Sequence, residues 1–179
     1  MSKTAHIALL ARYNAWMNNK LYEAAAALPP QELVADRKAF FGSLLATMNH
    51  LVVADTVWLQ RFAGHPRFAA ALAPVAALPA PASLEQPQAD GLAALRARRD
   101  LLDQHILDWC ASLQEDDFDT PIDYRSLKGV PARRALYPLL AHFFNHQTHH
   151  RGQASTLLSQ AGIDIGVTDL VVLVPELDP

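Results

Sequence analysis

The sequence has one cysteine, little excess charge and no long uninterrupted apolar run. Cys110 has no second cysteine with which to form an intrachain disulfide, so nothing favours an oxidising compartment. The 15 basic and 18 acidic side chains give a net charge of −3, and a weakly acidic chain lacks the electrostatic footprint of most nucleic-acid-binding proteins. Apolar stretches stay below the ~20 residues that a membrane span requires. Lys3, His6 and Arg12 interrupt the segment in which a signal peptide would lie. We therefore expect a cytoplasmic protein that binds neither nucleic acid nor membranes.

Four long segments have the apolar spacing of helices, with apolar residues recurring at steps of three and four positions. These segments cover residues 4–28, 40–62, 88–113 and 133–161. Pro29 and Pro30 end the first segment, and Gly162 caps the last. A chain of 179 residues has the length of one domain. The pattern predicts an all-α fold, a four-helix bundle formed as a single domain by residues 1–179.

The connections between these segments differ in composition. Residues 65–88 are rich in alanine and proline and are predicted to form a long, irregular surface connection between the second and third helices. Residues 119–129 read as a short hairpin or a plain loop before the fourth helix. The apolar run Leu170–Val174 in the tail is expected to pack on the edge of the bundle.

Four of the eight histidines lie in the fourth segment, between positions 142 and 150. At about 100° per residue, His142, His146, His149, His150 and Gln153 project within about 100° of one another. His146 and His150 are one helical turn apart, so their imidazoles can converge on one metal ion. Neutral imidazole is a good ligand for zinc, copper, iron and nickel. The alternative is a set of solvated histidines or histidines bonded to backbone carbonyls. The pattern favours a metal site, with a third ligand from elsewhere in the chain.

Two common histidine-containing sites do not fit. The zinc-protease motif H-E-x-x-H needs a glutamate as general base, and Gln147 stands at that position. A di-iron bundle needs Glu-x-x-His pairs. The fourth segment has no acidic residue between Arg133 and Gln160.

The second segment contains two further candidates, His50 and Asp55. His50 is a candidate for the third metal ligand, although it can equally be a histidine of the core or the surface. Asp55 shares a helical face with Met48, Val52 and Leu59, where a carboxylate is costly unless it is paired or bonded. We expect Asp55 to orient a ligand histidine or to pair with an arginine, rather than to act directly in catalysis.

Other polar residues in the helical segments have structural interpretations. Asn14 and Asn18 lie one turn apart, and an interhelical hydrogen bond is favoured over bonding within a cavity. Arg96, Arg98 and Arg99 are expected on the solvent face of the third helix.

Together these residues resemble the DinB family of the DinB/YfiT-like superfamily. The matching stretches are residues 13–18, 40–58, 123–129 and 142–153, and the last contains the string H-x-x-x-H-R-G-Q. The resemblance implies a four-helix bundle with a metal held by three histidines, His50, His146 and His150. His142 and His149 then lie beside the ligands or on the surface. The resemblance further implies nickel or zinc as the metal and a homodimeric assembly.

Three histidine ligands leave an open position on a metal, which is typical of catalytic sites. Relatives in the superfamily include thiol-dependent transferases, so an enzyme that uses a low-molecular-weight thiol is one expectation. Metal-assisted hydrolysis by an activated water is another. In either case Asp55, Asn14 or Arg151 is a candidate for positioning a second substrate. The alternative is a non-enzymatic metal-binding, stress-response or scaffold protein, since the family name suggests a damage-inducible gene.

Overall fold

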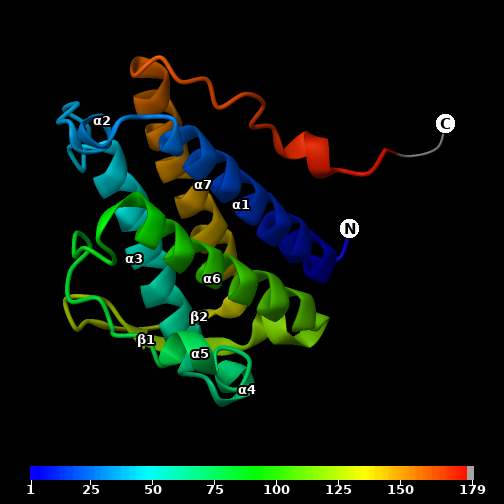
Figure 1. Cartoon of the computed structure of the whole chain (residues 1–179). Helices are drawn as coiled ribbons and strands as arrows, with labels where there is room; N and C mark the ends of the chain where they lie inside the picture. The colour runs from blue at the N-terminus through cyan, green and yellow to red at the C-terminus, as the bar shows by residue number, and fades with distance from the viewer. Residues whose placement is uncertain (177–179) are drawn as a thin grey trace.

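Four long helices lie side by side and form most of the molecule (Figure 1). The computed structural model describes residues 1–176; residues 177–179, the end of the predicted domain, lie outside the described residues. The long helices are α1 (Lys3–Ala26), α3 (Leu44–Ala63), α6 (Gly91–Ser112) and α7 (Leu136–Gln160). Helices α1 and α3 each pack against both α6 and α7. The four predicted helical segments are therefore confirmed, with shifted boundaries.

Local sequence signals explain where two of these helices begin. The Ser2 hydroxyl accepts a hydrogen bond from the Ala5 N–H at the start of α1, and Ser43 does the same for Ala46 at the start of α3. Helix α3 begins at Leu44 rather than at the predicted residue 40. The preceding residues form a tight turn, in which Gly42 has a φ of 78° that glycine adopts without strain.

A two-stranded antiparallel sheet precedes α7. Strand β1 (Pro121–Arg125) pairs with β2 (Pro131–Ala135), with Pro121 opposite Ala135. This confirms the hairpin and shortens the predicted fourth helix, because residues 133–135 pair with β1 before α7 begins. The fold is thus mostly helical with a small sheet, and the all-α description is too strict.

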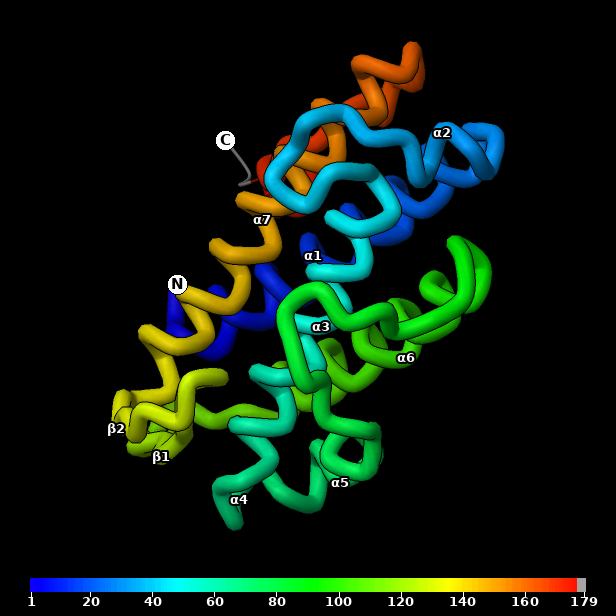
Figure 2. The backbone as a smooth tube through the Cα atoms, turned by 90° about the vertical axis from the view of Figure 1, so that its left-hand side faces the viewer, coloured from blue at the N-terminus to red at the C-terminus, as the bar shows by residue number. Residues whose placement is uncertain are grey.

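The connection between α3 and α6 is less irregular than predicted. It contains the short helices α4 (Pro66–Ala69) and α5 (Ala73–Ala76). Phe68, Leu72 and Val75 from this region are buried in the core, so its first half is not a surface connection. The second half folds back alongside α3 (Figure 2). There the Asn49 side chain bonds the backbone of Gln86 and Gln88.

Three further short elements occur within residues 1–176. They are the helix α2 (Pro30–Val34) and the 3-10 helices η1 (Glu115–Asp119) and η2 (Leu170–Leu173). Helix η2 lies against α1, but Val171 and Val172 remain more than half exposed, so the tail packs only in part. Among the helices of residues 1–176, none is both long and apolar enough to cross a membrane.

Candidate metal centre

Three histidines from two helices converge on one point. Helix α3 supplies His50, and α7 supplies His146 and His150. The Nε2 atom of His146 lies 3.3 Å from Nε2 of His50 and 3.1 Å from Nε2 of His150. Ligand atoms from all three lie within 4.8 Å of one another, and within residues 1–176 no cysteine or carboxylate belongs to the group. We call this group the histidine cluster.

Hydrogen bonds fix the orientation of two of the three imidazoles. Nδ1 of His50 lies 3.1 Å from the carbonyl oxygen of Leu84, and Nδ1 of His150 lies 2.8 Å from Oε1 of Gln153. A carbonyl oxygen can only accept, so each Nδ1 carries the proton and donates it. The lone pair of each Nε2 therefore faces the centre of the cluster, as a metal ligand requires.

The spacing and charge of the cluster fit a divalent transition metal. Zinc–nitrogen bonds of 2.0–2.1 Å at tetrahedral angles place neighbouring nitrogens about 3.3 Å apart, close to the separations of 3.1 and 3.3 Å found here. Burial, together with the neighbouring histidines, lowers the pKa of His146 to about 3. Burial also lowers the pKa values of His50 and His150. The imidazoles are thus neutral near pH 7, the state in which they bind metals.

Phe41 covers one side of the cluster. Its ring stacks on His50 at a centroid distance of 4.1 Å and lies 5.6 Å from the ring of His150. The tight turn before α3 positions this ring, and sequence reasoning did not single it out. The pair Phe40–Phe41 before the Gly42–Ser43 turn was the available signal. No signal could indicate the contact with Leu84, because it uses a backbone carbonyl.

The other two histidines of α7 lie beside the cluster on the exposed side of the helix. The ring of His142 is 5.9 Å from that of His146 and packs against Trp58 at 5.2 Å. His149 packs edge-on against His150, and its Nε2 accepts from the amide of Gln153 at 3.3 Å. Neither belongs to the histidine cluster.

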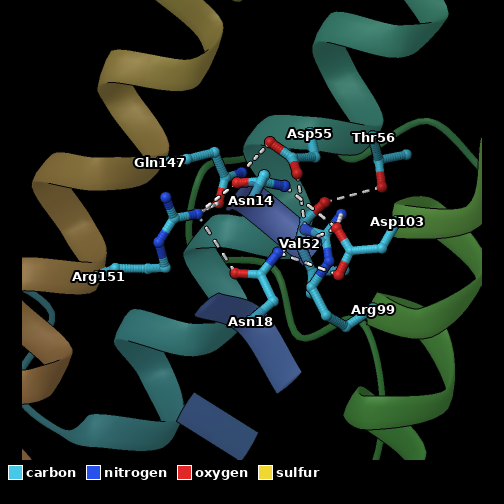
Figure 3. Close-up of polar contacts among 9 residues, drawn as sticks. All are labelled: Asn14, Asn18, Val52, Asp55, Thr56, Arg99, Asp103, Gln147 and Arg151. Carbon is cyan, nitrogen blue, oxygen red and sulfur yellow. Dashed lines mark hydrogen bonds and ion pairs between the residues drawn. The ribbon is translucent and has the colours of Figure 1, made fainter. Parts of the chain in front are cut away.

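The opposite side of α7 faces a buried polar network that joins all four long helices (Figure 3). Every member is at least 90% buried; the members are Asn14, Asn18, Asp55, Arg99, Asp103, Gln147 and Arg151. The Arg99 guanidinium lies 2.6 Å from Asp55 and 3.0 Å from Asp103. Burial opposes the charge of Arg99, but the two carboxylates raise the pKa of Arg99 above its ordinary value.

Carboxamides connect the second arginine to the same carboxylates. Asn14 accepts a hydrogen bond from Arg151 and donates to Asp103 at 3.1 Å. Gln147 donates to Asp55 and accepts from Arg151 at 3.5 Å. The two positive and two negative charges of the network therefore balance through a closed path of bonds.

The contacts in this network test several of the expectations drawn from the sequence. Asp55 pairs with an arginine, as one of its two interpretations predicted, and Asn14 makes the predicted interhelical bond. The expectation that Arg99 faces solvent was wrong, because its helical face meets Asp55 and Asp103. The polar contacts of Asp55 and Asn14 are with the network, and Arg151 adds a bond to Thr148; none of the three bonds the histidine cluster. Gln147 belongs to the network and directly follows His146 in the chain, so it links the network to the histidine cluster.

Comparison with known proteins identifies the family of this chain. The model of the DinB family matches residues 1–174. Protein DinB of Bacillus subtilis (strain 168) is 26% identical over 160 residues, which span 89% of this chain and 88% of that protein. No solved structure matched the chain. Since the family model extends over nearly the whole sequence, the chain belongs to the DinB family.

Proposed function

We propose that the protein is a metal-dependent enzyme in which His50, His146 and His150 hold a nickel or zinc ion. The observation that carries this proposal is the convergence of three Nε2 atoms, to which residues 1–176 add no fourth histidine, cysteine or carboxylate ligand. Three protein ligands with an open position are typical of catalytic rather than structural zinc sites. The ion supplies Lewis-acid chemistry, since it lowers the pKa of a thiol or a water at its open position.

Among reactions of this kind, we favour a thiol-dependent transfer. Within the described part of the chain, no carboxylate joins the histidine cluster to accept a proton from water. A thiol has an ordinary pKa near 8.5, so it loses its proton to solvent far more readily than water does. In this proposal His50 and His150 keep their lone pairs directed inward, and Phe41 shields the face of His50 on which it stacks.

Hydrolysis is the second candidate, and the position of His142 favours it. Its ring lies 5.9 Å from that of His146, and burial, aided by the charge of Arg61, lowers the pKa of His142. A neutral imidazole there can take a proton from water. A non-enzymatic metal-binding role stays open as the alternative to both reactions.

The metal content of tag-free protein tests the first step. We expect about one equivalent of nickel or zinc in the wild type. His50→Ala, His146→Ala and His150→Ala should each lose it, whereas His105→Ala, which removes an imidazole from α6, should keep it. If the wild type stays metal-free after incubation with both metals, the proposal is wrong.

Turnover then separates an enzyme from a binding protein. We would measure the conjugation of low-molecular-weight thiols to chlorodinitrobenzene, in which a carbon–sulfur bond forms and chloride leaves. The metal-loaded wild type should accelerate this reaction and His146→Ala should not. Ester and amide hydrolysis measured in parallel, with His142→Ala as the diagnostic variant, tests the second candidate. Inactivity across both panels with metal bound would favour the non-enzymatic role.

The family also suggests how the molecule is assembled. We propose that the four long helices form the bundle typical of the DinB/YfiT-like superfamily, as a single domain that pairs into a homodimer. Light scattering coupled to size-exclusion chromatography tests the dimer, since a mass near 19.6 kDa would indicate a monomer.

A further inference from the structure

A strip of aromatic and arginine side chains runs from the histidine cluster to the hairpin. We call it the aromatic–arginine strip; its members are Trp58, Arg61, Tyr124, Arg134 and His142. The Arg61 guanidinium lies 4.6 Å from the ring centroid of Trp58 and 5.1 Å from that of Tyr124. Arg134 lies 5.9 Å from the Tyr124 ring and donates a hydrogen bond to its hydroxyl. Two cations are thus held on aromatic rings, which favour such contacts.

Arg61 is the unusual member of the strip. Within residues 1–176, its side chain makes no hydrogen bond and no ion pair, although the side chain is half-buried and burial lowers its pKa. A guanidinium carries five N–H donors and no acceptor. Among the described residues, no Arg61 nitrogen is both buried and unpaired, so solvent reaches the guanidinium. A bound anion would replace that water with charge-assisted hydrogen bonds. Asp123, which precedes Tyr124 in β1, is paired with Arg133 at 3.0 Å.

The strip adjoins the histidine cluster. His142 links the two, because its ring lies 5.2 Å from Trp58 and 5.9 Å from His146. On α3, Arg61 follows His50 by 11 residues, or three turns, and so shares its face about 16 Å further along the axis. The hairpin completes the strip, since β1 packs on α3 and β2 on α7.

We propose that the aromatic–arginine strip binds an oxyanion, the carboxylate or phosphate group of a small-molecule substrate whose other end reaches the histidine cluster. This inference rests on the proposed function and adds a substrate class to it, an elongated anionic molecule. Arg61 supplies the main contact, because its guanidinium lies against two neighbouring rings and has no acceptor among the described residues. Arg134 adds a second positive charge at the exposed end.

Matched thiols test the inference in the zinc-loaded protein. Binding of mercaptohexanoate and mercaptohexanol would be measured by calorimetry; the two differ only in the carboxylate. A charge-assisted hydrogen bond contributes about 1.5–3 kcal/mol, so the acid should bind about 10- to 100-fold more tightly. Arg61→Gln should abolish this difference. Arg12→Gln, which removes an exposed arginine of α1, should preserve it. The shorter mercaptopropionate should gain less from its carboxylate.

A second experiment on metal-free protein tests the anion site independently of the proposed function. Hexanoate, butyl phosphate and hexanol would be titrated into metal-free protein while the Trp58 indole N–H is followed by NMR. Saturable shifts with either anion, but not with hexanol, support the strip even if no thiol binds the loaded protein. The tighter of the two anions identifies the oxyanion.

Two results would overturn the inference. One is equal affinity for the acid and the alcohol in the loaded wild type. The other concerns the indole shift: either the anions cause no shift in the wild type, or they cause the same shift in Arg61→Gln. If no thiol binds but the indole shift is present and depends on Arg61, the proposed function fails and the anion site stands.

Discussion

His150 and Gln153, one turn apart on α7, form a hydrogen bond of 2.8 Å between Nδ1 and Oε1. The same amide donates to Nε2 of His149 at 3.3 Å. In this orientation the amide oxygen meets His150 and the amide nitrogen meets His149, so the proton of the His150 ring lies on Nδ1. Gln153 therefore acts on the metal centre without touching its inner face.

The bond between His150 and Gln153 predicts a loss of metal affinity in Gln153→Ala. Without the acceptor, the His150 proton can move to Nε2 and block the lone pair. Removing such a supporting contact typically weakens metal binding 10- to 100-fold. Competition with a chromogenic chelator measures the change. Gln104→Ala, an exposed glutamine of α6, is the control; equal zinc affinity in both variants would contradict the prediction.

The histidine cluster makes the metal-free protein sensitive to acid. The pKa of His146 is lowered to about 3, mainly by burial, while an unfolded chain takes up that proton near pH 6.5. Between these values the unfolded state binds more protons, so the free energy of unfolding falls as the pH falls from about 6.5 towards 3. His50 and His150 add to this trend.

Thermal unfolding of metal-free protein across this pH range provides the measurement. His146→Gln should show a shallower decline than the wild type, because it lacks the group with the largest shift. Identical pH profiles for the two proteins would count against the lowered pKa.

The buried polar network predicts opposite outcomes for two adjacent arginines. Arg99→Met leaves the carboxylates of Asp55 and Asp103 buried without their partner, which should reduce the free energy of unfolding by about 3–5 kcal/mol. Arg98→Met removes a partly exposed arginine and should change it by less than about 0.5 kcal/mol. Urea denaturation compares them, and similar midpoints would show that the network contributes little.

Replacing either of two glycines with alanine should change the free energy of unfolding, but in opposite directions. Gly42 has a φ of 78° in the turn that positions Phe41, so Gly42→Ala should destabilise the protein by about 1 kcal/mol. Gly152 lies within α7 with open space at its Cβ position, so Gly152→Ala should stabilise it by about 0.5–1 kcal/mol. Paired denaturation curves decide; a destabilised Gly152→Ala would indicate that this position has a role other than helix formation.

The sequence predicts those features that depend on local periodicity. The spacing of His146 and His150 places them on one helical face before any tertiary structure is known, and the long helices follow from apolar spacing. Arg99 shows what local periodicity cannot predict. A run of charged residues is ordinarily solvated, and only the positions of Asp55 and Asp103 in the fold make the burial of Arg99 favourable. Phe41 could not be placed for a similar reason, since its stacking on His50 depends on the path of the turn between them.

The buried polar network also specifies the alignment of the helices. Apolar helices can slide along one another with little loss of contact, and a slip of one turn moves a helix by 5.4 Å. Such a slip would separate Arg99 from Asp55, or Arg151 from Asn14, and leave a charge buried without a partner. Wrong registers are therefore penalised far more than the native one is stabilised. Because Gln147 belongs to this network and His146 is its neighbour, the alignment that satisfies the buried charges is also the one that brings the three imidazoles together.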